Sequence, residues 1–124
     1  MSLLSKVVDY IETELNFLKD ELLFEAYYPD EPDNIVSVFP SLGDPPETYS
    51  TRRTKHIEIK VRASLYDDGD SLCEQVFNLF HSKENFYIDD VFVLHSYALT
   101  EMDYLYADEK GRHEFSFELA FYLK

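Results

Sequence analysis

The chain has 124 residues and a formal net charge of -14 at pH 7, from 25 acidic and 11 basic side chains. Such an acidic surface repels phosphate backbones and anionic lipids, which excludes a classical DNA-binding protein. With 45% hydrophobic and 16% aromatic residues, the composition also excludes a disordered chain. We therefore expect a single domain over residues 1–124, long enough to bury about two thirds of the surface of the unfolded chain.

The first segment predicts an amphipathic helix over residues 2–20. Its apolar side chains recur at steps of three and four, which places them on one face: Leu3, Val7, Ile11, Leu15, Leu18 and Leu22. Lys6, Asp9 and Glu12 interrupt every apolar run, so we expect neither a signal peptide nor a membrane span. The single Cys73 cannot form an internal disulfide. These features indicate a protein made in the cytoplasm, with no membrane partner.

The next segments predict two short strands and a long loop. Residues 23–28 are rich in aromatic side chains and end at PDEPDN, where two prolines and three acids stop regular structure. The alternation in NIVSVF indicates another strand. PSLGDPPETYST follows with three of the five prolines, so we expect an exposed loop over residues 40–51. A loop of this length in so small a domain usually has a function.

A strand and a second helix are predicted next. In TKHIEIKVRASL the apolar side chains alternate strictly with His56, Glu58, Lys60 and Arg62, the period of two of a strand with one solvent-exposed face. The period then changes to that of a helix in DDGDSLCEQVFNLFHSK, where the apolar face holds Leu72, Val76, Leu79 and Phe80. Ser71 with Glu74 could form a capping box, or Asp68 could cap the helix one turn earlier.

The last third predicts strands around one more loop. FYIDDVFVLHSYAL indicates a strand with a turn near Asp89 and Asp90, and HEFSFELAFYL keeps its apolar side chains on one face over nine residues. Between them, residues 100–112 form a predicted loop. The links between strands are mostly too short for crossovers. We therefore expect an α+β domain, with a mainly antiparallel sheet and two helices packed on one side of it.

No catalytic or metal-binding motif emerges from the sequence. The four histidines, His56, His81, His95 and His113, have no metal-ligand spacing, and DDGDSLCEQ fails as a calcium loop because serine, tyrosine and glutamine occupy ligand positions. Cys73 and His81 would lie about 12 Å apart along a helix, so Cys73 is interpreted as a small buried side chain. We expect no enzymatic activity, no metal and no cofactor.

Five of the eleven basic side chains are concentrated in one segment: Arg52, Arg53, Lys55, Lys60 and Arg62. With Glu58, they give residues 52–62 a net charge of +4, so the rest of the chain carries -18. Lys60 and Arg62 could simply form a solvated face that pairs with acids across the sheet. Arg52 and Arg53 could instead bind a carboxylate on another chain, or, less favourably, a phosphate.

Tyr104 and Tyr106 lie among acids in EMDYLYADEKGR, a composition typical of contact residues at interfaces. The alternative is that one or both of these tyrosines fold back onto the sheet.

Three runs in sequence order resemble one known family: PDNIVSVFPSLGDPP, then IEIKVRASLYDDGDSLCEQVFNLF, then ADEKGRHEFSFELAFYL. They resemble the minor capsid or tail-completion proteins of tailed bacteriophages, in the class that includes the tail terminators of siphophages. The likeness covers nearly the whole chain. One departure is LGDPP, where related sequences often carry Gly-Gly before the proline.

The resemblance implies a virion protein of the tail or neck, made in the bacterial cytoplasm and without catalytic chemistry. It implies a homo-oligomeric ring, a hexamer, that caps the tail tube and contacts the head-completion or connector protein. By that analogy the loops 40–51 and 100–112 contact the neighbouring proteins. The candidate interface residues are therefore Pro45, Pro46, Tyr104 and Tyr106 in these loops, together with Arg52, Arg53 and Lys55. DNA would pass through an acidic lumen without specific binding.

One rival hypothesis comes from another class. A small and very acidic protein could be a DNA mimic that occupies the DNA site of a nuclease or repressor. Such a mimic would space its acids along one surface like phosphates, whereas the acids here are scattered through turns and helix faces.

Overall fold

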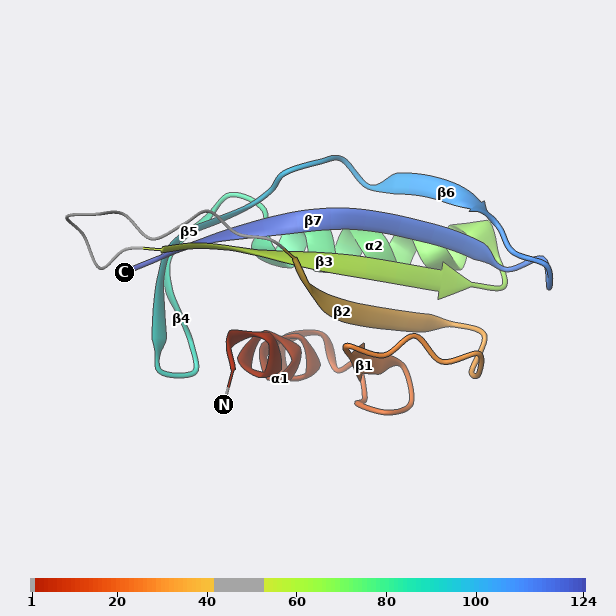
Figure 1. Ribbon diagram of the computed structural model, residues 1–124, viewed down its shortest axis with the longest axis horizontal. Coiled ribbons are helices and arrows are strands. Elements are labelled where there is room, and N and C mark those ends of the chain that lie inside the picture. The colour runs from red at the N-terminus through yellow and green to blue at the C-terminus, as the bar shows by residue number, and fades with distance from the viewer. Residues whose placement is uncertain (1, 42–52) are drawn as a thin grey trace.

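The computed structural model describes residues 2–41 and 53–124 of the chain. Within them lie two helices and seven strands, in the order α1 (Leu3–Leu15), β1 (Leu23–Glu25), β2 (Ile35–Ser41), β3 (Arg53–Ala63), α2 (Tyr66–Phe80), β4 (Lys83–Ile88), β5 (Val91–Ala98), β6 (Asp103–Ala107) and β7 (His113–Leu123) (Figure 1). The strands form one sheet in the order β1-β2-β3-β7-β5-β4, and β6 also pairs with β7. Only β1 and β2 are parallel, so the predicted α+β class with a mainly antiparallel sheet is confirmed.

Strands β3 and β7 form the long axis of the sheet. They pair over eleven residues, from Arg53 opposite Leu123 to Ala63 opposite His113. At about 3.3 Å per residue this ladder is roughly 35 Å long. On its far side β7 pairs first with β6 and then with β5, which follow one another along the same edge. Residues at the two ends of this ladder are therefore far apart in space.

Both helices pack against one continuous core. The α2 helix covers β3, β7 and β5, and Phe77 and Phe80 contact Phe117 and Phe121 on β7. The α1 helix contacts β1 and β2 at one end of the sheet and β4 at the other, so the sheet curls around it. The rings of Tyr10 in α1 and Phe80 in α2 lie 5.6 Å apart. The two helices thus share one side of the sheet, as predicted.

The first helix is shorter than predicted. It ends at Leu15, because Asn16 adopts a left-handed conformation (φ 59°) and its backbone N–H donates to the carbonyl of Glu12. Beyond that point Phe17 turns into the core, while Leu18 is 56% exposed. Leu3, Val7 and Ile11 form the packed stripe, but the extension of that stripe to Leu18 is wrong.

The second helix begins earlier than predicted. Its N-terminal flanking residue is Leu65, with no side-chain cap, so neither the Ser71–Glu74 box nor an Asp68 cap begins the helix. Asp67 and Asp68 lie in the first turn, where negative side chains interact favourably with the positive end of the helix dipole. Gly69 allows a close approach to the sheet, since a Cβ there would meet the Phe115 ring at 2.2 Å.

The predictions for the last third are confirmed in part. The turn near Asp89 and Asp90 joins β4 to β5, and Asp90 forms a 2.6 Å ion pair with Lys6 of α1. The segment 100–112 is not a loop throughout, because residues 103–107 form β6. Likewise β2 extends to Ser41, into the predicted proline-rich loop, whose remaining residues lie outside the described parts of the chain.

Candidate interaction surfaces

The described candidate residues lie at opposite ends of the β3–β7 ladder (Figure 1). Arg53 and Lys55 begin β3 and pair with Leu123 and Phe121 of β7. Tyr104 and Tyr106 belong to β6 and pair with Phe115 and Glu114 near the start of β7. From Phe115 to Leu123 the strand spans about 26 Å. The other candidates, Arg52, Pro45 and Pro46, lie outside the described residues.

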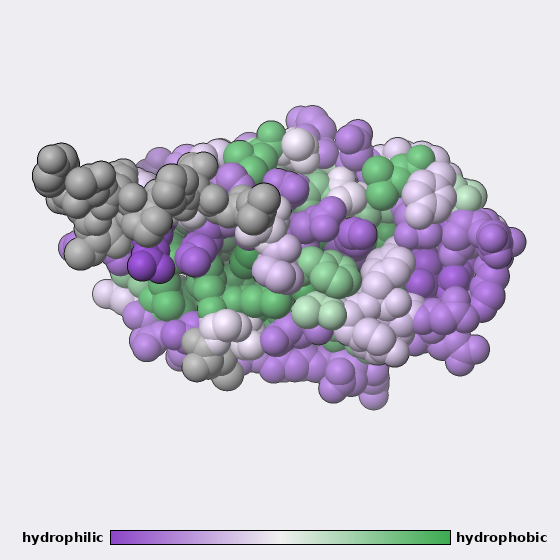
Figure 2. All heavy atoms as spheres, viewed as in Figure 1, coloured by the Kyte–Doolittle hydropathy of each residue, from purple (hydrophilic) through white to green (hydrophobic). Residues whose placement is uncertain are grey.

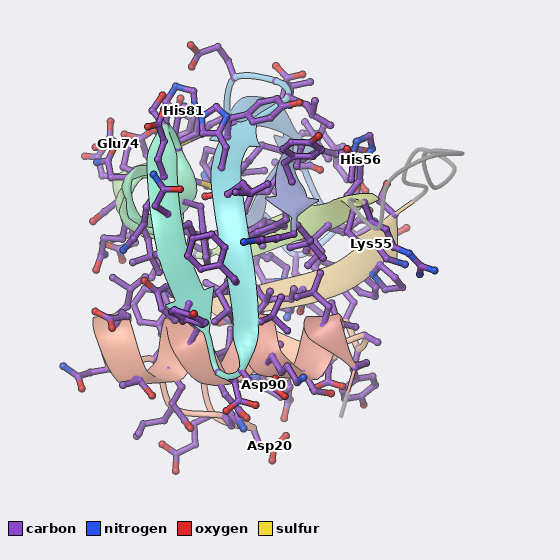
Figure 3. All side chains as sticks on the ribbon, turned by 90° about the vertical axis from the view of Figure 1, so that its left-hand side faces the viewer. Asp20, Lys55, His56, Glu74, His81 and Asp90 are labelled. Carbon is purple, nitrogen blue, oxygen red and sulfur yellow. The ribbon has the colours of Figure 1, made fainter. Side chains whose placement is uncertain are left out.

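The basic end, defined as Arg53 and Lys55, is exposed. Lys55 and His56 leave β3 on opposite faces (Figure 3). Among the described residues, no carboxylate lies within 4 Å of either cation of the basic end. Within the described ranges, the two cations are thus exposed and have no anionic neighbour.

A hollow of about 210 Å³ lies beside Lys55. It is lined by Ser2, Leu3, Leu4, Pro40, Ser41, Lys55, His56 and Ile57. Hydrophobic atoms are visible on this face between α1 and the sheet, with hydrophilic side chains around them (Figure 2). The basic end thus borders an apolar surface at the N-terminal end of α1.

The opposite end is aromatic. We define the aromatic end as Tyr66, Tyr104, Leu105 and Tyr106, whose side chains are 41–54% exposed. Tyr104 lies beside the ring of Tyr66 (5.3 Å) and makes a 3.0 Å hydrogen bond with His113 Nδ1. Tyr106 pairs with Glu114 on the other face of the sheet. Both tyrosines lie on the sheet as part of β6, and both still present surface to solvent. Their role in an interface stays a prediction.

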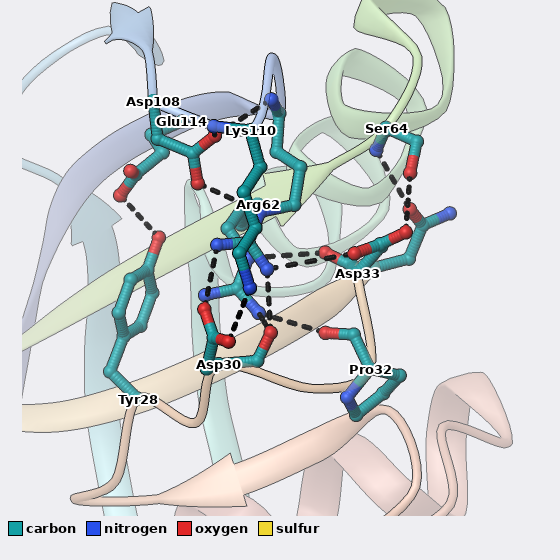
Figure 4. Close-up of polar contacts among 11 residues, drawn as sticks. Tyr28, Asp30, Pro32, Asp33, Arg62, Ser64, Asp108, Lys110 and Glu114 are labelled. Atoms are coloured by element: carbon teal, nitrogen blue, oxygen red, sulfur yellow. Dashed lines mark hydrogen bonds and ion pairs between the residues drawn. The ribbon is translucent and has the colours of Figure 1, made fainter.

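Arg62 is not part of a solvated face, and that interpretation is wrong. Its side chain is only 2% exposed. Its Nε donates to the carbonyl of Asp33, and its Nη2 donates to the carbonyls of Asp30 and Pro32, at 2.8–3.2 Å (Figure 4). The Tyr28 ring lies 5.1 Å from its guanidinium carbon. Arg62 therefore holds the segment between β1 and β2 on the outer face of the sheet.

Arg112 is a second buried cation that the sequence patterns do not single out. Its Nε donates to Asp108 Oδ2 at 2.8 Å, and its Nη2 donates to Asp30 Oδ1 at 3.0 Å. Lys110 also pairs with Asp30. These contacts fasten PDEPDN to ADEKGR, across about 80 residues of sequence. The opposite charges of these side chains are the only sequence signal of this contact.

The same ion pairs perturb the carboxyl groups. Hydrogen bonds from Lys110 and Arg112 lower the pKa of Asp30, and the hydrogen bond from Lys6 lowers the pKa of Asp90. Burial opposes a low pKa at Asp108, but hydrogen bonds from the backbone N–H and side chain of Arg112 outweigh it. The folded state thus binds fewer protons than the unfolded state in acid.

We expect the free energy of unfolding to be insensitive to these carboxyls at pH 5–7 and to fall below about pH 4, the ordinary pKa of aspartate. Asp30→Asn should lower the free energy of unfolding at pH 7. It should also make that free energy fall less steeply in acid, because the amide of the variant cannot gain a proton on unfolding. Urea unfolding between pH 7 and pH 2.5 measures this, with Glu84→Gln on β4 as the control. An acid decline equal to that of the wild type would contradict it.

Cys73 and His81 both take part in the fold of the described chain. Cys73 is fully buried, and its burial raises the pKa of the thiol to about 12. His81 accepts a 3.0 Å hydrogen bond from the backbone of Ala98 through Nδ1. In residues 2–41 and 53–124, no group of three His, Cys, Asp or Glu side chains is placed to hold a metal ion. No helix in these same ranges is long and apolar enough to cross a membrane.

Comparison with known proteins identifies a family. Residues 7–124 match the family model described as bacteriophage tail terminator protein. No curated protein matches the sequence. One solved structure superposes over 98% of this chain and 90% of its own length, with a TM-score of 0.57 and 8% identity, which shows a shared fold alone. Because the family model spans nearly the whole sequence, this chain belongs to the bacteriophage tail terminator protein family.

Proposed function

We propose that copies of this chain form a closed ring, a hexamer by resemblance, which caps the tail tube and presents a surface to the head-completion protein. The observation that carries the proposal is the family match over residues 7–124, which implies a virion component of the tail. The role is structural and needs no cofactor. Tail tube protein and head-completion protein are its proposed partners.

The distribution of charge supports contact between copies. A chain with a net charge of -14 repels its own copies at long range. The basic end offers an exposed cationic surface at one extremity of the β3–β7 ladder. A surface that meets a different surface on the next copy generates a ring when the rotation closes. We therefore assign the basic end, together with Arg52, to the interface between copies.

The remaining acidic surface suits a channel for DNA. Like charges on the lumen and on the phosphate backbone avoid the ion pairs that cause non-specific binding. DNA would then pass the ring without being held. Pro45 and Pro46, in the segment between β2 and β3, remain our proposal for contacts with the tube or the connector.

The oligomeric state tests ring formation. We expect light scattering after size exclusion to give one discrete mass, a multiple of 14.6 kDa, that decreases at high salt. Exchanging Arg52 and Arg53 together for glutamate should weaken this assembly, because two cations of the interface become anions. Gln75→Glu with Asn78→Glu, two exposed changes on α2, is the control for added negative charge away from the basic end. A double variant that assembles like the wild type would contradict the assignment.

A further inference from the structure

Strand β6 has an edge without a partner strand in the described parts of the chain. It pairs only with β7, whereas β5, which precedes it on the same side of β7, is covered by β4. All five of its residues are exposed. Monomeric proteins usually protect such an edge with lysine, proline or a covering element. The sequence of β6, DYLYA, contains neither lysine nor proline.

The side chains at this edge combine aromatic surface with negative charge. Tyr104, Leu105 and Tyr106 are 41%, 47% and 54% exposed. Glu101 and Asp103, at the start of the strand, are exposed as well, and no described cation lies within 4 Å of their carboxylates. Exposed tyrosines with acids beside them suit a partner that carries arginine and lysine.

A second copy of this chain carries such a surface at its other end. Arg53 and Lys55 lack a carboxylate partner among the described residues and lie about 26 Å along the ladder from β6. Two copies that met through β6 on both sides would bring two acidic surfaces together. A head-to-tail arrangement instead sets the acids of one copy against the cations of the next.

We propose that β6, with Glu101 and Asp103, is the surface that receives the basic end of the neighbouring copy. This inference rests on the proposed ring, and it adds the receiving side and the direction of the contact. The tyrosines supply apolar area at this interface, and the acids select the orientation of the neighbouring copy.

Two charge reversals and their mixture test the inference. Asp103→Lys cancels the negative charge beside β6, because Glu101 remains, and Lys55→Glu cancels the positive charge of the basic end, because Arg53 remains. For each variant alone, we expect the dissociation constant of the assembly to be about tenfold or more above that of the wild type. An equimolar mixture should reassemble, because in alternation two unchanged ends meet at one interface and the two reversed side chains meet, with opposite charges, at the next. The double variant, with both reversals in one chain, should reassemble by itself.

Matched controls separate these effects from folding and from net charge. Glu84→Lys on β4 changes the charge by the same amount as Asp103→Lys, and it should assemble like the wild type. Thermal unfolding should be nearly unchanged for every variant, because Lys55, Glu84 and Asp103 are exposed and have no ion-pair partner in the described residues.

The outcomes distinguish this inference from the proposed function. If the wild type forms rings but Asp103→Lys assembles equally well, or the mixture stays dissociated, then β6 is not the receiving surface and the ring stands. If the wild type is monomeric at every concentration, the assignment of β6 as the receiving surface is also overturned. The proposed function is then decided separately, by binding to tail tubes.

Discussion

Replacing Phe80 by alanine is expected to lower the free energy of unfolding by about 3–5 kcal/mol. Phe80 is fully buried at the end of α2, and its ring contacts Tyr10 of α1 and Phe121 of β7 at 5.6 and 5.3 Å. One side chain thus joins both helices to the sheet. Its removal leaves a cavity that three elements would have to collapse to fill. For a domain with about 5–15 kcal/mol of total stability, this is a large share.

Urea unfolding monitored by tyrosine fluorescence measures the effect of the Phe80 change. The variant Phe80→Leu removes less volume and should lower the free energy of unfolding by less than the alanine variant does. The carbonyl of Phe80, which accepts a 2.6 Å hydrogen bond from Ser96, is present in both variants. An alanine variant as stable as the leucine variant would show that Phe80 does not join the three elements.

Replacing Arg62 by methionine is expected to lower the free energy of unfolding by about 2–4 kcal/mol. The change removes charge-assisted donors from three backbone carbonyls on the outer face of β3, those of Asp30, Pro32 and Asp33. The relief from burying a charge offsets part of that loss. Lysine has a single ammonium and cannot reproduce the planar fork, so Arg62→Lys should restore only part of the stability.

Lys60→Met is the matched control for Arg62→Met, because Lys60 lies on the same face of the same strand. Its Nζ lies 5.8 and 5.6 Å from the ring centres of Tyr28 and Phe39, and it makes no ion pair in the described residues. Its loss should cost less than about 1 kcal/mol. Equal costs at positions 60 and 62 would mean that the carbonyl contacts of Arg62 do not stabilise the fold.

These two positions also show where sequence reasoning stops. Alternation predicts β3 and β7 well, because an apolar face against a polar face is a local signal. Lys60 and Arg62 have the same place in that alternation, yet only Arg62 is buried. The segment that covers it comes from residues 26–34, and no local pattern shows that this segment crosses the sheet.

The same limit explains the two other misjudged segments. The sequence predicts a loop where β6 lies, because its aromatic residues stand among acids and it buries no side chain, so no period of two appears. α1 ends early because Asn16 adopts a left-handed conformation, although the apolar spacing continues to Leu22.

Of the candidate interface residues, Arg53, Lys55, Tyr104 and Tyr106 are all exposed, which the sequence anticipates from composition alone. Their separation to opposite ends depends on the register of β6 on β7.

Electron microscopy of tail tubes mixed with a gold-labelled form of the protein tests the proposed function most directly. The tubes would come from the phage that encodes the chain, assembled in its absence. A tail terminator should place label at one end of each tube, in a ring, and tubes capped in this way should join to completed heads. Label along the sides of the tubes, or none at either end, would contradict the account.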